Sequence, residues 1–270
     1  MGRCVEILLV RLAAPLLAPC LLALFIASSA PAFAQTVDAQ DYDAFWLWAG
    51  VAPQPLLARA HTLYILQGQV EAPRGDAGPA RLIAQGAAPV RVGSSEVWLA
   101  YRAHTLRWTP AIHAQMLARI DRWRAAGTPI AGVQIDFDAR TRHLDEYGAF
   151  LRDLSPRLPR GLKLSVTGLL DWTAGRDPAG LNALGGVVDE VVIQTYQGRR
   201  TIPGYGAYLA SLTRLRFPFK IGLIQGGEWS PPPDLAANPW FRGYVVFLKN
   251  GDRGRPAIAA PPSTTEPPRP

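Results

Sequence analysis

The sequence predicts one short (β/α)8 barrel, a TIM-like α/β fold in which some helices are abbreviated. Three observations favour this fold class. Eight strand-like segments follow one another, amphipathic helical segments separate several of them, and together they occupy about 210 residues, from Asp41 to Asn250. A chain with 49% apolar and 18% charged residues can bury a sizeable core, and this composition excludes a disordered or collagen-like protein.

The eight expected strands are short runs rich in Val, Ile, Leu and aromatic residues. Gly, Pro or polar residues bound most of these runs, as is typical of strands that are covered on both faces. In chain order the runs are Ala44–Gly50, Thr62–Gln69, Glu96–Arg102, Gly132–Asp138, Leu162–Leu169, Glu190–Tyr196, Lys220–Gln225 and Gly243–Lys249.

Helical segments account for several of the connections. Thr109–Ala126 has a Thr at the N-cap position, Pro at the first helical position and apolar residues at helical spacing. Leu144–Leu154 and Tyr205–Leu215 repeat the amphipathic pattern. Strands that alternate with helices indicate βαβ units and a parallel sheet. Pro and Gly dominate the connections after the first and seventh strands, so we expect abbreviated helices there.

An open doubly wound sheet is the alternative architecture. It is less favoured because no G-x-G-x-x-G motif follows the first strand and the chain has no P-loop. The sequence therefore gives no support for a nucleotide, and no cofactor is expected.

The two ends of the chain differ from the part between them. Residues 1–34 combine a basic start, an apolar run and an Ala-Phe-Ala exit, which predicts a secretory signal peptide. The expected location is periplasmic or extracellular, with no membrane span after cleavage; an uncleaved membrane anchor is the alternative. Residues 35–250 form the expected single barrel domain, and residues 251–270 are typical of a disordered Pro-rich tail.

Cysteine, histidine and charge exclude several kinds of site. Cys4 and Cys20 both lie in the leader, so the remaining chain has no thiol. The four histidines are scattered, so no metal site is expected. The formal charge of +7 falls to +6 without the leader (26 basic minus 20 acidic residues). Because Arg199-Arg200 is the only basic pair in a charge otherwise spread along the core, no nucleic-acid partner is expected.

The fourth strand carries the residues with the clearest chemistry. Side chains alternate along a strand, so Gln134, Asp136 and Asp138 should face the barrel axis while the apolar residues between them face the helices. The Cα atoms of neighbouring residues on one face lie about 6.6 Å apart along the strand. Repulsion between the two carboxylates should raise the pKa of one of them, as a general acid needs. Alternatively, Asp138 caps the next helix or binds one of the arginines that follow it.

Other strand ends bring amides, hydroxyls and indole rings to the same end of the barrel. This combination suits a sugar, because aromatic rings stack on it and amides orient it. The predicted ligand-binding residues are Gln134, Gln194, Tyr196, Trp46, Trp172, Glu228 and Trp229. Further polar groups expected at this end are Gln67, Gln69, Ser165, Thr167 and Gln225.

Several of these residues also have a structural interpretation. Trp46 could pack in the core, and Gln194 could be a structural hydrogen-bonding residue. Arg102 and His104 could bind an anionic group, although solvated loop residues are the simpler interpretation. The joint pattern of polar groups at several strand ends is therefore the main evidence for a ligand site.

Two segments resemble signatures of the chitinase-like, family-eighteen glycoside hydrolases. Ala131–Asp138 (AGVQIDFD) resembles the fourth-strand motif D-x-x-D-x-D-x-E, with Asp136 on the last aspartate. Gln194–Gln197 (QTYQ) resembles M-x-Y-D on the sixth strand, with Tyr196 at the tyrosine. The resemblance implies a barrel fold and a glycan ligand.

The departures from these signatures affect the chemistry. Ala131, Gln134 and Gln197 stand where the family has aspartates, and Asp138 stands where it has the acidic glutamate. Asp is one methylene shorter than Glu, and nothing in the sequence indicates an N-acetyl sugar. The family's substrate-assisted mechanism is therefore not carried over.

Nearly the whole core also resembles the bacterial domain of unknown function 3142 family, through GVQIDFD on the fourth strand and QTY on the sixth. That resemblance implies an exported protein with this fold and no known activity.

Two functional hypotheses follow from the sequence. In the first, the chain is an exported glycoside-hydrolase-like protein that binds, and can cleave, a glycan at the carboxyl end of the barrel. Asp138 would donate the proton, Asp136 would tune its pKa, and Tyr196, Gln194 and Gln134 would orient the sugar. In the second, the chain is a non-catalytic glycan-binding or cell-envelope interaction protein on a degenerate hydrolase scaffold. The sequence leaves open whether it is an enzyme, and it does not determine the oligomeric state.

Overall fold

The computed structural model of the chain describes residues 34–73, 78–93, 95–138, 143–173, 179–209, 212 and 214–250. These residues belong to one compact unit of the chain. The predicted Pro-rich tail and, except for Ala34, the predicted signal peptide lie outside the described residues.

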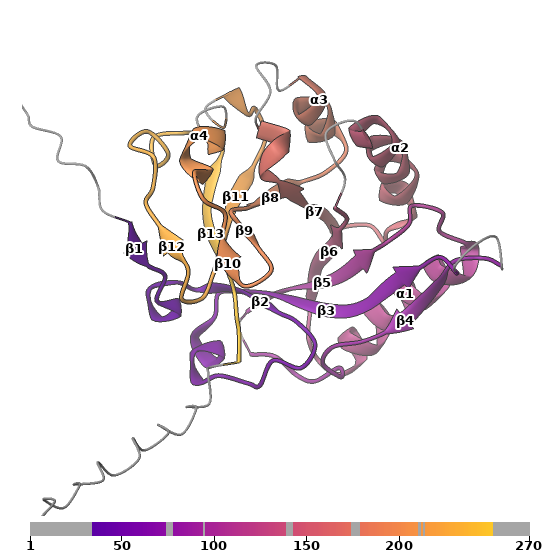
Figure 1. Ribbon diagram of the computed structural model, residues 1–270. Coiled ribbons are helices and arrows are strands. Elements are labelled where there is room, and N and C mark those ends of the chain that lie inside the picture. Colours follow the sequence, from indigo (N-terminus) through magenta and orange to yellow (C-terminus); the bar gives the residue numbers. More distant parts are fainter. Residues whose placement is uncertain are drawn as a thin grey trace, which may run out of the picture. The chain divides into compact units, whose positions relative to one another are not determined.

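Eight parallel strands form a closed barrel, which confirms the predicted fold class (Figure 1). Around the barrel they follow the order β2-β13-β11-β8-β7-β6-β5-β3, and pairing of β2 with β3 closes the ring. Each of the eight predicted segments overlaps one of these strands. They are β2 (Ala44–Leu47), β3 (Thr62–Glu71), β5 (Glu96–Ala103), β6 (Ile130–Asp136), β7 (Lys163–Leu169), β8 (Glu190–Gln194), β11 (Phe219–Ile224) and β13 (Phe241–Phe247).

The helices are short except for two on one side of the ring. The α-helices are α1 (Pro110–Ala125), α2 (Leu144–Leu154), α3 (Ala179–Asn182) and α4 (Tyr205–Leu209). The 3-10 turns are η1 (Ala39–Asp41), η2 (Pro55–Arg59), η4 (Ser155–Arg157), η5 (Leu170–Thr173) and η6 (Ala183–Gly186). Within the described part of the chain, none of the helices is long and apolar enough to cross a membrane.

The sequence predicted the bounds of α1 and α2 to within one residue at each end. Thr109 caps α1 as predicted, because its side-chain oxygen accepts a hydrogen bond from the backbone N–H of Ile112. Of the predicted helix Tyr205–Leu215, the structure describes Tyr205–Leu209 as α4, while residues 210, 211 and 213 lie outside the described residues. Only η2 follows β2, and no helix occurs between β11 and β13, which confirms the abbreviated connections.

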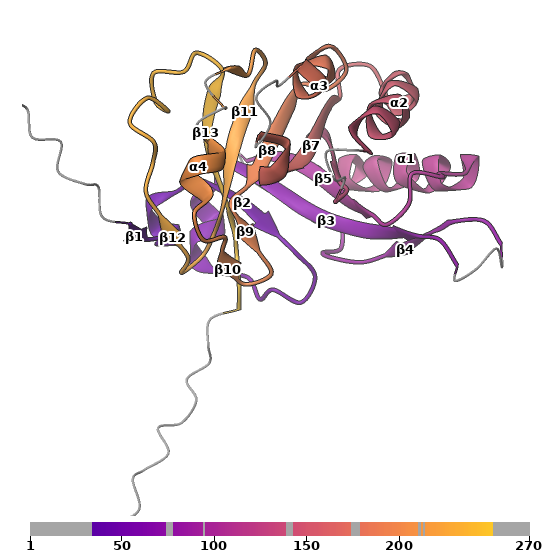
Figure 2. The same cartoon turned by 45° about the horizontal axis from the view of Figure 1, so that its top comes forward.

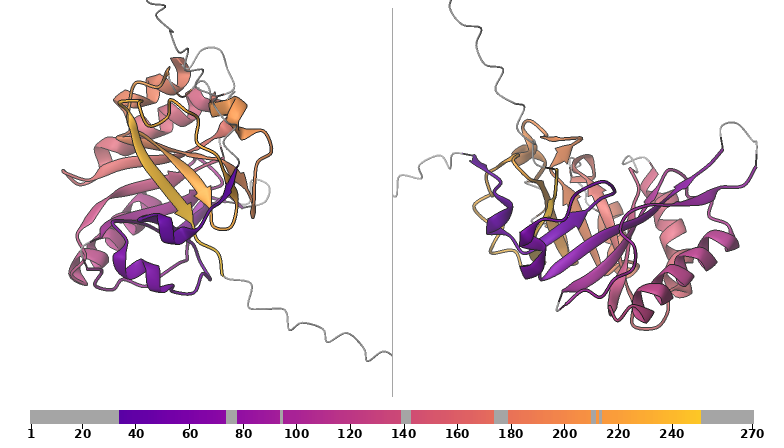
Figure 3. Two further views of the ribbon diagram at one scale, coloured as in Figure 1. Left: turned by 90° about the vertical axis from the view of Figure 1, so that its left-hand side faces the viewer. Right: turned by 90° about the horizontal axis from the view of Figure 1, so that it is seen from below.

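A β-hairpin, which the sequence did not predict, takes the place of a helix after β3. β3 is 10 residues long; its first half pairs with β2, and Gly68–Glu71 pairs in antiparallel register with β4 (Arg81–Ala84). The hairpin reaches beyond the barrel strands (Figures 2 and 3). Two smaller sheets pair β1 (Gln35–Thr36) with β12 (Glu228–Trp229), and β9 (Tyr196–Gln197) with β10 (Arg200–Thr201).

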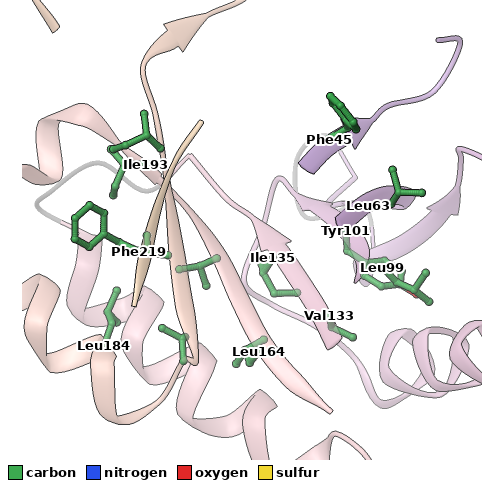
Figure 4. Packing of buried hydrophobic residues seen from close by; sticks show 14 of the residues in the cluster. Phe45, Leu63, Leu99, Tyr101, Val133, Ile135, Leu164, Leu184, Ile193 and Phe219 are labelled. Atoms are coloured by element: carbon green, nitrogen blue, oxygen red, sulfur yellow. The ribbon is translucent and has the colours of Figure 1, made fainter. Parts of the chain in front are cut away.

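The side chains of β6 alternate as predicted. Val133 and Ile135 belong to the main hydrophobic cluster (Figure 4). The same cluster includes Tyr147 and Leu151 of α2, so the side chains of Val133 and Ile135 face the helix side of β6. The Tyr147 hydroxyl donates to the backbone carbonyl of Ile135 at 3.1 Å and so ties α2 to β6. Gln134 and Asp136 on the other face are almost completely buried.

A chain of side-chain hydrogen bonds runs along the barrel axis. The indole N–H of Trp46 donates to Gln134 Oε1 at 2.6 Å, and Gln134 Nε2 donates to Ser165 Oγ at 2.9 Å. The Ser165 hydroxyl in turn donates to Glu190 Oε1 at 3.0 Å. β2, β6, β7 and β8 are therefore joined through their inward side chains as well as through their backbones.

The carboxylate of Glu190 ends this chain at the amino-terminal side of the barrel. It accepts a hydrogen bond from the Tyr64 hydroxyl at 2.5 Å and pairs with Lys220 Nζ at 3.1 Å. Lys220 also donates to the Tyr64 oxygen at 2.8 Å. Both charged side chains are largely buried, so each depends on the other for compensation.

Two glycines make room for indole rings on the axis. A Cβ on Gly132 of β6 would lie 2.5 Å from the Trp98 ring, and a Cβ on Gly222 of β11 would lie 2.7 Å from the Trp46 ring. The glycine in the motif of the fourth strand therefore has a packing role.

The Glu190–Lys220 pair predicts a strong single-variant effect. Lys220→Met should lower the free energy of unfolding by about 3–5 kcal/mol, because it leaves a buried carboxylate without its cation. The double variant Lys220→Met, Glu190→Gln should recover part of that loss in urea unfolding. Equal stability of the single and double variants would contradict the pairing.

Gly132→Ala is expected to destabilise the fold by about 1–3 kcal/mol, the usual cost of overpacking a core. Gly186→Ala is the matched control, since a Cβ on Gly186 would meet nothing within 4 Å. Thermal and urea unfolding of both variants measure the effect; the packing role is refuted if the two variants lose the same stability.

Candidate functional site

A cavity of about 730 Å³ opens at the carboxyl ends of the barrel strands. It is lined by four of the predicted site residues, Asp136, Asp138, Gln194 and Tyr196. Trp48, Arg102, Asp171, Tyr208 and Phe247 supply much of the remaining wall. The position agrees with the rule that functional groups of such barrels gather on this face.

Asp136 is the buried carboxylate of the site. Its Oδ1 accepts a hydrogen bond from the Thr167 hydroxyl at 2.7 Å, and its Oδ2 lies 3.6 Å from a guanidinium nitrogen of Arg102. Burial raises the pKa of Asp136, while Arg102 and the Thr167 hydrogen bond oppose that rise and Asp138 adds to it. Burial is therefore the main cause of the rise at Asp136, whereas repulsion between the two carboxylates was the cause expected from the sequence.

Asp138 lies beyond the last residue of β6 and is 60% exposed. Its Oδ2 accepts a hydrogen bond from Arg102 at 3.0 Å, so one guanidinium bridges both carboxylates. This partner comes from the neighbouring strand, whereas the arginines that follow Asp138 lie outside the described residues. Bridging by Arg102 fixes the two carboxylates relative to each other at the cavity wall.

Arg102 is a site residue whose importance was not predicted from the sequence. The solvated-loop interpretation is wrong for its position, because Arg102 lies within β5, is one-third exposed and contacts both carboxylates. The missing information was strand register: Arg102 is the direct β5 partner of Asp136.

Aromatic side chains form another part of the cavity wall. The ring of Phe247 lies 5.6 Å from the rings of both Trp48 and Tyr196. In the eight-strand ring β13 lies four positions from β6, so Phe247 and Asp136 come from opposite strands of the barrel. A ligand in the cavity would therefore meet aromatic rings on one side and carboxylates on the other.

Gln194 and Tyr196 line the cavity, as predicted. Gln194 is the last residue of β8, and Tyr196 is the first residue of β9. Gln194 is partly exposed at the end of β8, so its amide is accessible to a ligand. Burial and the nearby carboxylate of Asp136 raise the pKa of Tyr196 well above its usual value. Its hydroxyl therefore stays protonated and can donate a hydrogen bond.

Trp46 and Gln134 lie below the cavity, not in its wall. Both are buried, and they hydrogen-bond to each other on the barrel axis. The Trp46 ring lies 6.4 Å from the Tyr196 ring, edge-on. The core-packing alternative for Trp46 is thus the one that the structure favours, and Gln134 reaches the site only through its neighbours.

Three more predicted ligand contacts are not brought to the cavity. Trp172 is buried in the main hydrophobic cluster, and Trp229 is buried with its ring stacked 5.2 Å from that of Tyr205. Glu228 is exposed on β12 and does not line the cavity. These residues follow their strands by a few positions, and the turns there carry them outward.

Gln67 was expected at the mouth of the barrel but faces α1 instead. Its Oε1 accepts a hydrogen bond from the indole N–H of Trp123 at 2.8 Å. The register between β3 and β5 shifts between Leu66 and Gly68, so Gln67 is the extra residue of a bulge. Such a shift reverses the side of every later residue, which strand periodicity cannot predict.

Among the described residues, no three His, Asp or Glu side chains come close enough together to hold a metal ion. Acid/base and hydrogen-bonding chemistry is what the observed side chains can supply.

The raised pKa of Asp136 makes a prediction with a defined sign. A folded-state pKa above the unfolded value of about 3.9 means that ionising Asp136 costs stability. As pH rises from the unfolded-state pKa of about 3.9 to the higher folded-state pKa, the wild-type protein should therefore lose stability relative to Asp136→Asn. The slope of this loss is at most about 1.4 kcal/mol per pH unit.

Urea unfolding of both proteins between pH 4 and 7 measures the difference. Asp121→Asn, at an exposed position of α1, controls for the loss of one negative charge. A wild-type protein that gains stability relative to Asp136→Asn over the same range would refute the assignment.

Three solved structures illustrate what the chain is similar to. The spore cortex-lytic enzyme SleL of Bacillus cereus shares 16% identity at a TM-score of 0.43, over 68% of this chain and 50% of that one. The xylanase and alpha-amylase inhibitor protein of Scadoxus multiflorus shares 11% at 0.47, over 75% and 92%. The chitinase domain of the Clostridium difficile spore coat protein CotE shares 13% at 0.43, over 73% and 67%. The strand pairings of the chain itself define its closed eight-stranded barrel.

A family model gives a match confined to part of the barrel, while no curated protein matches the chain. The matched stretch, residues 105–212, includes β6, β7 and β8 and therefore the cavity residues Asp136, Asp138, Gln194 and Tyr196. It is shorter than the nearly complete core that the resemblance implied. Over residues 105–212 the chain matches the domain of unknown function 3142 family, which confirms the predicted resemblance for this part of the chain.

Proposed function

We propose that the chain is a glycoside-hydrolase-like protein that binds a glycan in the cavity and cleaves it by carboxylate acid/base chemistry. One observation carries the proposal: Trp48, just after β2, and Phe247 of β13 line the cavity together with Asp136 of β6, and β13 is the strand opposite β6 in the ring. Sugars present apolar C–H faces that stack on such rings and hydroxyls that hydrogen-bond to carboxylates and amides.

The two carboxylates have different environments and hence different proposed roles. The ion pair between Asp138 and Arg102 opens when the ligand enters, and Asp138, the exposed member, gives its proton to the leaving oxygen as the glycosidic bond breaks. Water then adds to the sugar carbon, and a proton returns to Asp138. Asp136, whose carboxylate is held by the Thr167 hydroxyl and lies beside Arg102, stabilises in its ionised form the positive charge that develops at the sugar ring. Tyr196 and Gln194 orient the sugar from the other strands.

Binding without cleavage is the second candidate function. It is favoured by the Arg102 guanidinium, which already engages both carboxylates, and by Asp138 at the place of a longer glutamate. On this alternative the pair contributes only hydrogen bonds and negative charge to glycan recognition.

The location that we propose is outside the cytoplasm, in the periplasm or beyond it. The basic start, apolar run and Ala-Phe-Ala exit of residues 1–34 support export.

The test measures binding and cleavage separately. Wild-type protein is incubated with a panel of bacterial cell-wall and matrix polysaccharides, and retention and release of reducing ends are recorded. Asp138→Asn should abolish cleavage, with a loss of at least about 100-fold for a general acid, while keeping retention. Trp48→Ala should weaken retention, because it removes an aromatic face of the cavity.

The outcomes distinguish the two candidates. If Asp138→Asn still cleaves the polysaccharide, Asp138 is not the proton donor. The same assay on Asp136→Asn then tests whether Asp136 is the donor. Retention without cleavage in the wild type selects the binding function. A wild-type protein that neither retains nor cleaves any polysaccharide of the panel refutes both.

A further inference from the structure

We infer that the inner face of the β3–β4 hairpin continues the glycan-binding surface, so that the ligand is an oligosaccharide chain and not a single sugar. The inference rests on the proposed function and specifies its substrate class. It arises from a part of the fold that the cavity itself does not use.

The hairpin lies on the same face of the barrel as the cavity. β3 pairs with β2 only through Ala44–Leu47 and Thr62–Ile65, and its later residues Gly68–Glu71 pair with β4 and with the end of β5. These later residues therefore stand beyond the carboxyl end of the barrel wall, where the cavity opens. Figures 2 and 3 show how far this ribbon extends past the barrel strands.

Three polar side chains form a hydrogen-bonded row on this ribbon. Gln69 Nε2 donates to Gln85 Oε1 at 2.7 Å, and Gln69 Oε1 lies 3.2 Å from His104 Nε2. Gln69 and Gln85 are partly exposed, and His104 is exposed. The row is therefore held in place by its own hydrogen bonds while it keeps surface available to a ligand.

Strand register places this row on the same face as the cavity residues. Gln69 is the parallel partner of Arg102, and Arg102 is the parallel partner of Asp136. Partners in adjacent parallel strands point to the same side of a sheet. The surface is thus built from four adjacent strands. β6 carries Asp136, β5 carries Arg102 and β3 carries Gln69, while Gln85 directly follows β4.

The span of this surface fits several sugar rings. Three strand spacings of about 4.8 Å each give about 14 Å between the strands that carry Gln85 and Asp136. Apart from the charged groups of Arg102 and Asp136, the surface presents two amides and an imidazole, which can donate and accept the hydrogen bonds that hydroxyls require. Ile83, the cross-strand partner of Gln69, adds a partly exposed apolar side chain for a C–H face.

The experiment compares ligand length with and without the row. Oligosaccharides of two to eight sugars are prepared from the polysaccharide that wild-type protein retains, and their affinities are measured by calorimetry with Asp138→Asn as the non-cleaving background. Affinity should rise with length beyond the ring or rings that the cavity holds. Gln69→Ala and Gln85→Ala should each weaken binding of the longest oligomers about fivefold and leave the shortest unchanged.

Two controls separate this inference from the function on which it rests. Gln40→Ala removes an exposed glutamine before the opposite, amino-terminal end of β2 and should change no affinity. Trp48→Ala should weaken short and long oligomers alike. Affinity that is independent of length, or hairpin variants that bind long oligomers like wild type, would overturn the inference alone. Failure of wild-type protein to retain any polysaccharide would refute the proposed function and the inference together.

Discussion

The hydrogen-bonded chain along the barrel axis is the constraint on which the rest of the structure depends. Closing eight strands leaves an interior that side chains must fill, and here buried polar side chains lie among the aromatic and aliphatic residues of a second hydrophobic cluster. Each polar group buried without a partner would cost about 1–3 kcal/mol. Trp46, Gln134, Ser165 and Glu190 satisfy one another across four strands, and Lys220 neutralises the charge at the amino-terminal end. Strand register is therefore fixed from inside the barrel as well as by backbone pairing.

The candidate site lies directly above this axis and takes its rigidity from it. Gln134 is held from two sides, so Asp136, two residues later on the same strand, emerges at a fixed height. Thr167 and Arg102 then hold its carboxylate, and Arg102 reaches out to Asp138. The site thus contains a buried carboxylate, Asp136, and an exposed one, Asp138, two residues apart, and the guanidinium of Arg102 lies between them. This arrangement gives two chemically identical groups different access to a ligand, and burial raises the pKa of Asp136.

The strands and the carboxylate pair were predictable because they depend on local pattern. Apolar runs bounded by turn residues located all eight strands, and alternation placed Val133 and Ile135 outward and Asp136 inward. The errors arose where the fold departs from regular alternation. A bulge turned Gln67 towards α1, and a hairpin replaced a helix after β3. Trp172 and Trp229 were expected at the ligand site, but Trp172 is buried in η5 and Trp229 is buried in β12.

The sequence by itself determined the class of fold, the order of the barrel strands along the chain and the strand on which both aspartates lie. These properties follow from periodicity and turn chemistry, which act over a few residues. Only the tertiary structure decided that Arg102 bridges Asp136 and Asp138, that Phe247 faces them across the ring, and that the hairpin row adjoins the cavity. Those relations depend on register between strands distant in sequence and on closure of the ring, because a one-residue shift in register changes which side chains meet.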